Sequence, residues 1–513
     1  MMVAVICPCR PCLPLQEIPF FGPDNAKETD MGCAGETGDP SRNIRVPCRM
    51  RAFAFAALSC LALPWILACS RQEDPDDLLA RGNPTGLKVL LVGIDGATFS
   101  IIKPMIAEGK LPQMRKLMEG GAHGVLKSDP PMQSPALWTS MVTGRGRKAH
   151  GVKGFVRRKG LLRRRRLIGS DDRKIPALWN CMGLFGKSAG FIGWWASWPA
   201  EPVKGWIVSD RVTRSRWTEW TDGQQEWGLT FPPGLIDELR PLAVDPANPP
   251  MDEIGELVQF TSDELKEFHA ATKPLYAHWL SVFKFAYCTQ RSYEKFALHM
   301  LEKDWPDLTG VFLIANDPVC HTFWHFYQPD EFQGVDPEKA RRLGRLIPSF
   351  YEHNDRYLAQ LLAKVHPDTV VLIVSDHGFQ ATGKVPEMIP SEKFDVLRRE
   401  AMKKGTVAVG QSGEHHVDGI LIAYGPPIKT GVALEAHIFD IAPTILALMG
   451  LPVPKDMEGR VLTEMLDPSF LEDHPVQTIP SFNDYFKGHQ RTVSEGANEG
   501  EIMDRLRSLG YVK

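Results

Sequence analysis

The segment KVLLVGID, residues 88–95, is an apolar run that starts after Lys88 and ends at Asp95. An apolar run without alternation is typical of a strand buried on both faces, as in a mostly parallel sheet covered by helices. Similar runs follow at Val311–Ala315, Val370–Val374 and Gly419–Tyr424, and helical patterns lie between them, including Pro135–Thr143, Lys339–Val365 and Ile438–Met449. The sequence therefore predicts an α/β fold with a mostly parallel sheet and helices on both faces.

Three of these strands run into an aspartate, and these residues are Asp95, Asp317 and Asp376. The carboxyl ends of strands form the ligand crevice in open α/β sheets. Three carboxylates that converge there repel one another unless a cation lies between them. A single aspartate at a strand end is usually a cap or turn residue, so the prediction depends on the whole set.

Histidines accompany the aspartates. His377 directly follows Asp376, His321 comes four residues after Asp317, and His415 precedes the strand that begins at Gly419. Three aspartates and three histidines can form two tetrahedral metal sites. Carboxylate and imidazole ligands suit Zn²⁺ best, with Mn²⁺ or another divalent ion as the alternative. We therefore expect two divalent metal ions as cofactors.

A candidate nucleophile lies in the segment MQSPALWTS, residues 132–140. Ser134 is predicted to be the N-cap of a helix with Pro135 at its first position. The positive end of a helix favours an alkoxide and a phosphate group. The alternative is that Ser134 is only a structural helix cap.

Several motifs together resemble the alkaline phosphatase superfamily, and specifically its type I phosphodiesterase/nucleotide pyrophosphatase branch. The resemblance covers about residues 87–466, in the order expected for that family. Its motifs are GIDGAT (93–98), QSPALWTSMVTG (133–144), HG (150–151), NDPVCHTFW (316–324), SDHGF (375–379), GEHHVDG (413–419), IFDIAPTILALMGLPVP (438–454) and MEGRVL (457–462).

This resemblance implies a role for each matching residue. One metal would be bound by Asp95, Asp376 and His377, and the other by Asp317, His321 and His415. His415 is preferred to its neighbour His416 because it keeps the family's four-residue spacing to Gly419. Ser134 would contact the metals as the nucleophile and form a covalent phospho-enzyme intermediate.

The function that follows is metal-dependent hydrolysis of phosphoric esters, with a phosphodiester or nucleotide pyrophosphate bond as the first expectation. Hydrolysis of phosphomonoesters or phosphonates at the same site is the alternative, and an inactive envelope binding protein on this fold is a second one. The expected substrate is a phosphorylated small molecule or a lipid head group. The net charge of −3 gives no sign of specific nucleic-acid binding.

The cysteines are unevenly distributed, because seven of the ten lie within residues 1–69. The run AFAFAALSCLALPWILAC, residues 52–69, follows Met50-Arg51 and resembles a bacterial lipoprotein signal ending at a lipidated Cys69. An uncleaved membrane anchor or a buried helix are the alternatives. We expect Met50 to be the true start and the protein to be tethered to the membrane in the bacterial cell envelope, periplasmic or extracytoplasmic.

The predicted organisation has seven parts. They are a start-site artefact or disordered segment (1–49), a signal-like segment (50–69), a polar tether (70–86), two parts of a catalytic core (87–200 and 306–470), an inserted helical cap without a comparable strand (201–305) and a C-terminal tail (471–513). Thirteen Lys and Arg residues fall within 145–174. They are interpreted as a solvated basic loop or as an anion-attracting rim. Trp194, Trp195 and Trp198 are expected to pack under the cap or to line the mouth of the site.

Overall fold

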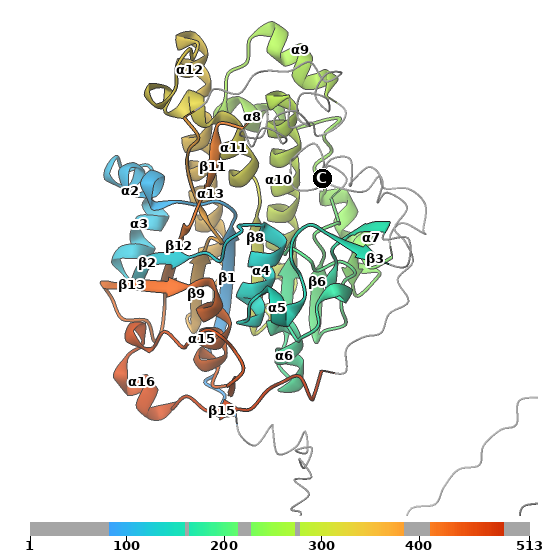
Figure 1. Cartoon of the computed structure of the whole chain (residues 1–513), viewed down its shortest axis with the longest axis vertical. Helices are drawn as coiled ribbons and strands as arrows, with labels where there is room; N and C mark the ends of the chain where they lie inside the picture. Colours follow the sequence, from blue (N-terminus) through green and yellow to red (C-terminus); the bar gives the residue numbers. More distant parts are fainter. Residues whose placement is uncertain (1–81, 160–163, 214–226, 272–277, 384–410, 487–513) are drawn as a thin grey trace, which may run out of the picture. The chain divides into compact units, whose positions relative to one another are not determined.

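A computed structural model describes residues 82–159, 164–213, 227–271, 278–383 and 411–486 (Figure 1). Its main element is a nine-stranded sheet. In sheet order, the strands are β13 (Val432–His437), β2 (Ala122–Lys127), β12 (Asp418–Tyr424), β9 (Thr369–Val374), β1 (Lys88–Ile94), β8 (Leu308–Leu313), β5 (Ala189–Ile192), β6 (Gly205–Val208) and β7 (Thr230–Phe231).

The predicted α/β fold class is confirmed. The five central strands β9, β1, β8, β5 and β6 run parallel to one another, and β12 runs antiparallel to both β9 and β2. The four predicted strands correspond to β1, β8, β9 and β12, with β8 beginning three residues earlier than expected. All residues of β8 and β9 are buried, which explains their unbroken apolar sequences.

The helices form two groups around the sheet. The helices of the first group contact one another, and two of them also contact the sheet: α3 lies on β2 and β12, and α10 lies on β8 and β5. This group consists of α2 (Phe99–Ala107), α3 (Pro112–Glu119), α10 (Trp279–Lys303), α11 (Asn316–Tyr327) and α13 (Leu346–Leu362). The other includes α4 (Ser134–Thr143), α5 (Arg147–His150) and α15 (Ile441–Leu448). The Trp138 ring of α4 packs so closely on Gly93 of β1 that a Cβ atom there would stand 2.7 Å from it.

Two predicted helices differ from the structure at their ends. The pattern over Lys339–Val365 forms two helices, α12 (Pro337–Leu343) and α13, which are separated near Gly344. A Cβ atom at Gly344 would lie 2.3 Å from the carbonyl oxygen of Phe326, so α11 approaches the backbone closely at this junction. The pattern over Ile438–Met449 forms a short 3₁₀ turn, Ile438–Asp440, followed by α15.

The interval 201–305 contributes to the sheet, so the expectation that it lacks a comparable strand is wrong. β6 pairs in parallel with β5, and β7 pairs antiparallel with β6. Both strands are short, and this explains why their pattern does not stand out in the sequence. The interval also forms α7 (Leu235–Leu239), α8 (Met251–Leu257), α9 (Ser262–Ala270) and α10. Whether these helices act as a cap stays a prediction.

The described ends of the chain are joined to the core. Asn83 and Thr85, in the predicted tether, donate backbone N–H groups to the carbonyls of Gly450 and Met449. The start of the predicted tail forms α16 (Pro468–Asp473) and β15 (Thr478–Ile479), which pairs with β14 (Val453–Pro454). The predicted signal and Cys69 lie outside the described residues. Within the described ranges, no helix is both long and apolar enough to cross a membrane.

A separate two-stranded sheet and a further helix precede β5 in the chain. The basic residues near 157 and 165 belong to an antiparallel pair, β3 (Val156–Lys159) and β4 (Arg164–Leu167). α6 (Leu178–Leu184) precedes β5 and contacts it.

Candidate functional site

The three predicted aspartates follow three neighbouring strands in the middle of the sheet. Asp95 follows β1, Asp376 follows β9 after Ser375, and Asp317 lies in the first turn of α11 after β8. The order β9-β1-β8 places these strand ends side by side, and the N–H of Asp95 donates to the carbonyl of Leu313 at 3.0 Å. The sheet therefore brings residues that are far apart in the sequence to one edge.

Two short strands bring His377 and His415 to the same edge. β10 (Gly378–Ala381) pairs antiparallel with β11 (Gly413–His416), and Phe379 is the register partner of His415. β12 begins directly after β11 and runs antiparallel to β9, so its first residues lie where β9 ends. The rings of His377 and His415 stack with their centroids 3.6 Å apart.

The first predicted metal-binding group is assembled in the structure. Ligand atoms of Asp95, Asp376 and His377 all lie within 4.8 Å of one another. The Nε2 atom of His377 lies 3.4 Å from Oδ1 of Asp95 and 3.6 Å from Oδ2 of Asp376. All three residues are buried.

The second predicted group is also assembled. Nε2 of His415 lies 3.0 Å from Oδ1 of Asp317, and Nε2 of His321 lies 3.3 Å from the same oxygen. The two Nε2 atoms are 2.8 Å apart. His377 is close to this group as well, with Nε2 3.7 Å from Oδ1 of Asp317, so the two groups adjoin.

The other ring nitrogen of each histidine is near a backbone carbonyl. Nδ1 of His321 lies 2.8 Å from the oxygen of Gly413, and Nδ1 of His377 lies 3.1 Å from that of Gly378. Nδ1 of His415 lies 3.2 Å from the oxygen of Met132. Because a carbonyl oxygen only accepts, each Nδ1 must carry the hydrogen, which leaves the Nε2 lone pair directed at the site.

The donor set fits divalent cations. Among the described residues, neither carboxylate oxygen of Asp376 has a hydrogen-bond partner, and Nε2 of His377 has none either, although all three atoms are buried. Buried polar atoms without partners are costly unless something else satisfies them. A carboxylate and an imidazole nitrogen directed at one point provide the hard and intermediate donors that Zn²⁺ and Mn²⁺ accept.

The charges at the site are strongly perturbed by burial. Burial raises the pKa of Asp376 well above its usual range, and the neighbouring Asp95 and Asp317 raise it further. Burial opposes ionisation of Asp317 too, but His321 and His415 hold its pKa well below the usual range. Burial lowers the pKa of both His377 and His415, so their imidazoles are neutral at pH 7 and able to act as ligands.

Ser134 is the first residue of α4 and is buried, with 3% of its surface exposed. The prediction that it is the N-cap is wrong by one position, because Gln133 is the N-cap and its backbone carbonyl accepts the N–H groups of Ala136 and Leu137. The hydroxyl of Ser134 has no hydrogen-bond partner among the described residues and is not used as a cap. Met132, whose carbonyl contacts His415, lies two residues before it.

Of the three tryptophans, Trp195 is the one whose indole N–H donates to a predicted site residue in the described part of the chain. Its indole N–H donates to Oδ2 of Asp95 at 3.4 Å. Trp194 is fully buried and donates to the carbonyl of Trp138, whereas Trp198 donates to the carbonyl of Trp227. The sequence pattern alone did not separate Trp195 from the other two.

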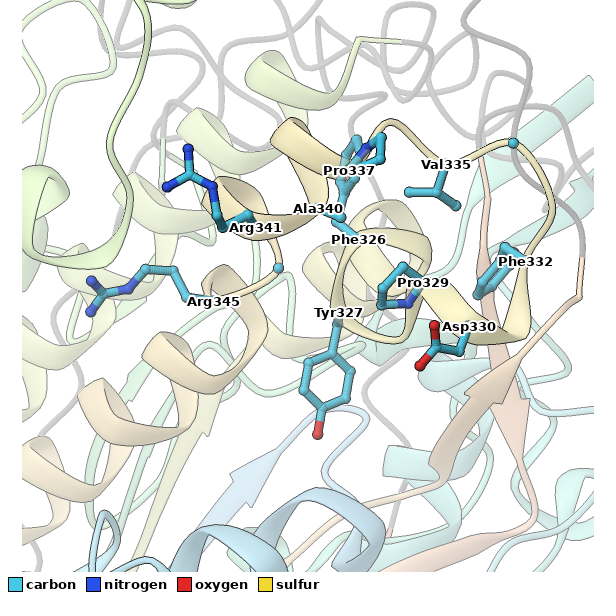
Figure 2. A pocket seen from close by; sticks show the side chains of 12 residues that line it. Phe326, Tyr327, Pro329, Asp330, Phe332, Val335, Pro337, Ala340, Arg341 and Arg345 are labelled. Carbon is cyan, nitrogen blue, oxygen red and sulfur yellow. The ribbon is translucent and has the colours of Figure 1, made fainter.

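A cavity of about 600 Å³ lies at the far end of α11 from Asp317 (Figure 2). Its lining includes Phe326, Tyr327 and Phe332, together with the exposed Arg341 and Arg345. None of the seven predicted site residues lines it, so it is separate from the site at the strand ends.

A match to a protein-family model shows the family to which the chain belongs. The model of the family described as type I phosphodiesterase/nucleotide pyrophosphatase matches residues 89–418, which includes every predicted site residue. The chain belongs to this family. The resemblance to this family that the motifs carry is therefore confirmed.

Individual relatives of this phosphodiesterase-family chain are distant. GPI ethanolamine phosphate transferase 2 of Kluyveromyces lactis is 24% identical over 176 residues, which are 33% of this chain and 22% of that protein. The chain thus aligns with only about a fifth of that curated relative.

Solved structures show a similarly low identity. An inactive murine ectonucleotide pyrophosphatase/phosphodiesterase 5 in complex with AMP is 14% identical, covers 74% of this chain and 100% of its own, and has a TM-score of 0.42. The alkaline phosphatase PafA is 13% identical, with coverages of 74% and 99% and a TM-score of 0.47. Phosphonoacetate hydrolase from Sinorhizobium meliloti 1021 with phosphonoformate is 11% identical, with coverages of 71% and 96% and a TM-score of 0.41.

Proposed function

We propose that the chain hydrolyses phosphodiester or nucleotide pyrophosphate bonds with Ser134 as nucleophile and two divalent metal ions, Zn²⁺ by preference. The metals would be held by the two groups of residues at the strand ends. The first group is Asp95, Asp376 and His377, and the second is Asp317, His321 and His415.

One observation carries this proposal. All three histidines have Nδ1 at a backbone carbonyl, so their Nε2 lone pairs converge on buried carboxylates. Structural histidines usually satisfy both ring nitrogens with hydrogen bonds, whereas ligating histidines use one nitrogen to fix the ring. Three separate segments would not be expected to share this arrangement unless it served cation binding.

Hydrolysis at this site would take place in two displacement steps at phosphorus. The oxygen of Ser134 attacks phosphorus in line with the leaving oxygen, the bond from phosphorus to that oxygen breaks, and the leaving group gains a proton. Water then attacks the phosphoryl group on Ser134, which still carries the substrate's other ester group, so that the monoester is released and the hydroxyl of Ser134 is restored. The positive end of α4 favours the alkoxide of Ser134. Divalent ions bound at the site would lower the pKa of the hydroxyl and neutralise the phosphate oxygens.

Substitution of the nucleophile tests the proposal. We expect Ser134→Ala to lower turnover of an aryl phosphodiester by at least about a thousandfold, as removal of other catalytic nucleophiles does. Ser134→Thr keeps a hydroxyl and should retain measurable turnover. The pure S134A protein should bind Zn²⁺ with nearly unchanged stoichiometry. Turnover by S134A equal to that of the unchanged protein would rule out Ser134 as nucleophile.

A substrate panel separates the alternatives. The proposal requires higher kcat/KM for bis-aryl phosphate or a dinucleotide than for an aryl phosphate monoester or a phosphonate. The reverse order would make the protein a phosphomonoesterase or phosphonate hydrolase. Substrate binding without any metal-dependent turnover would instead support an envelope binding protein.

The location of the enzyme is a further part of the proposal and is supported by the sequence alone. Residues 50–69 have the order of a lipoprotein signal, with Cys69 as the residue to be lipidated. Mass analysis of the N-terminus of the native protein should find a lipid-modified Cys69. A native peptide from residues 1–49 would overturn the assignment of Met50 as the start.

A further inference from the structure

The loop after β5 forms a hydrogen bond with the candidate metal site. Trp195 is 8% exposed and donates its indole N–H to Oδ2 of Asp95 at 3.4 Å. The other oxygen of Asp95, Oδ1, faces Nε2 of His377 at 3.4 Å. The two carboxylate oxygens therefore have different neighbours, one in the aromatic loop and one inside the site.

The loop adopts an unusual backbone conformation to reach Asp95. Gly193 and Ala196 both have positive φ angles, of 69° and 58°, and Ala196 is the sole non-glycine residue with a positive φ in the described part of the chain. A left-handed alanine is unfavourable and persists only when its surroundings enforce it. Such conformations cluster at functional sites.

The carboxylate of Asp210 holds this conformation in place. Its Oδ2 accepts the N–H of Ala196 at 3.1 Å, and its Oδ1 accepts the N–H of Trp198 at 3.0 Å. In return, the N–H of Asp210 donates to the hydroxyl of Ser197 at 3.0 Å. The left-handed Ala196 itself and Trp198, two positions later, are therefore fixed to one side chain that lies just after the end of β6.

Packing fixes the indole of Trp195 as well. Its ring meets Phe155 edge to face, with centroids 5.4 Å apart. At the start of the loop, a Cβ atom on Gly193 would stand 2.4 Å from the ring of Tyr293, so the loop lies close against α10. Trp195 thus has little freedom to move away from Asp95.

We propose that Trp195 is a positioning residue, held by the Asp210-bound loop, that orients the carboxylate of Asp95 for cation binding. By occupying Oδ2, the indole N–H directs Oδ1 toward His377 and Asp376. Hydrogen bonds to a ligating carboxylate of this kind commonly strengthen metal binding by about 10- to 100-fold. The inference rests on the proposed metal-binding role of Asp95.

Zinc binding to the full chain, measured by calorimetry after removal of metal, tests this role. Trp195→Phe keeps the ring against Phe155 but removes the N–H, and we expect the affinity for the Zn²⁺ ion at Asp95 to fall by about 10-fold or more. Trp198→Phe is the matched control, because its N–H donates to Trp227 rather than to Asp95. W198F should bind Zn²⁺ as the unchanged protein does.

A double variant tests the role of the loop. Asp210→Asn removes one of the two carboxylate acceptors and should also weaken Zn²⁺ binding. If Asp210 acts through Trp195, W195F/D210N will bind Zn²⁺ no more weakly than W195F alone. Independent losses that multiply in the double variant would contradict this route.

The outcomes separate this inference from the proposed function. Unchanged Zn²⁺ affinity in W195F, with melting temperature in the metal-free state also unchanged, would overturn the positioning role and leave the proposed function intact. Asp376→Asn lacks a proposed ligand and is the reference for lost binding. If the unchanged protein binds Zn²⁺ no better than this variant, the proposed function fails and this inference fails with it.

Discussion

The Nε2 atoms of His321 and His415 lie 2.8 Å apart, although 94 positions separate the two residues in the sequence. Both rings hold their Nδ1 hydrogens on backbone carbonyls, so the two Nε2 lone pairs face each other beside Oδ1 of Asp317. Two acceptor nitrogens and a carboxylate oxygen at these distances repel one another unless a proton or cation lies between them.

His415→Ala should lower both metal content and turnover, whereas His416→Ala should change neither appreciably. The reason is that His415 is directed at Asp317, while the half-exposed His416 receives the N–H of Asp418. We expect H415A to lose about one bound metal ion per chain and to lower kcat/KM by at least about 100-fold. Elemental analysis and steady-state kinetics measure the two effects. Equal metal content in both variants would contradict the assignment of His415.

Gly96 should tolerate no side chain, because its φ of +73° is combined with close contact to Phe379. A Cβ atom there would stand 2.5 Å from the Phe379 ring and 3.3 Å from the Cα atom of Asp317. Gly86 is the matched control, since its φ of +76° is almost the same and its Cβ position is open. Left-handed strain costs about 1–2 kcal/mol in both variants, and crowding adds about 1–3 kcal/mol in Gly96→Ala alone.

Urea unfolding of the two alanine variants measures this difference in the free energy of unfolding. G96A should also lose activity, because relief of the contact would move Asp95 or Asp317. Equal destabilisation of G86A and G96A would show that the Phe379 ring moves away from the new Cβ atom at little cost in free energy.

Most of the central sheet could be predicted from the sequence because β1, β8, β9 and β12 are buried on both faces and have continuous apolar sequences. β2 and β13 do not stand out in the sequence. The sequence of β2, AHGVLK, and that of β13, VALEAH, mix polar and apolar residues because both strands are only partly buried. β7 has two residues and no recognisable period.

The candidate site was predictable to a different degree. The aspartates could be placed from strand ends alone, because parallel neighbours end at the same edge. The contribution of Trp195 could not, since it depends on the left-handed Ala196 and on Asp210, and neither residue type indicates this conformation in a sequence. Tertiary hydrogen bonds fix such a loop, and they become visible only in three dimensions.

His150 should make the stability of the protein depend on pH below about 6.5. It is fully buried, accepts the N–H of Val152 at Nδ1, and contacts the hydroxyl of Ser140 through Nε2 at 2.9 Å. Burial, together with the nearby Arg173, Arg147 and Arg145, lowers its pKa to about 3. In the unfolded chain the pKa is near 6.5.

Below pH 6.5, His150 is protonated in the unfolded chain but stays neutral in the folded protein. The contribution of neutral His150 to stability is therefore complete above pH 6.5 and is lost as pH falls toward 3. The slope from this group is about 1.4 kcal/mol per pH unit. His150→Gln should remove that slope, and His366→Gln, at an exposed site, should not. Urea unfolding at pH 7.5 and pH 5.5 compares them, and an unchanged slope in H150Q would contradict the prediction.

Arg173, one of the basic residues in 145–174, should be required for stability rather than for attraction of anions. Its guanidinium and the carboxylate of Glu201 are 2% and 7% exposed, and one nitrogen contacts both carboxylate oxygens, at 2.9 Å and 2.7 Å. The indole N–H of Trp179 donates to the same carboxylate at 2.8 Å.

Because Glu201→Ala leaves the buried charge of Arg173 unpaired, we expect this substitution to lower the free energy of unfolding by about 3–5 kcal/mol. Asp263→Ala, which breaks an exposed pair with Lys266, should have an effect within experimental error. The double variant Arg173→Met/Glu201→Leu removes both charges and should recover part of the loss, although Trp179 still lacks an acceptor. Equal unfolding free energies for E201A and D263A would mean that Arg173 reaches water when its partner is removed.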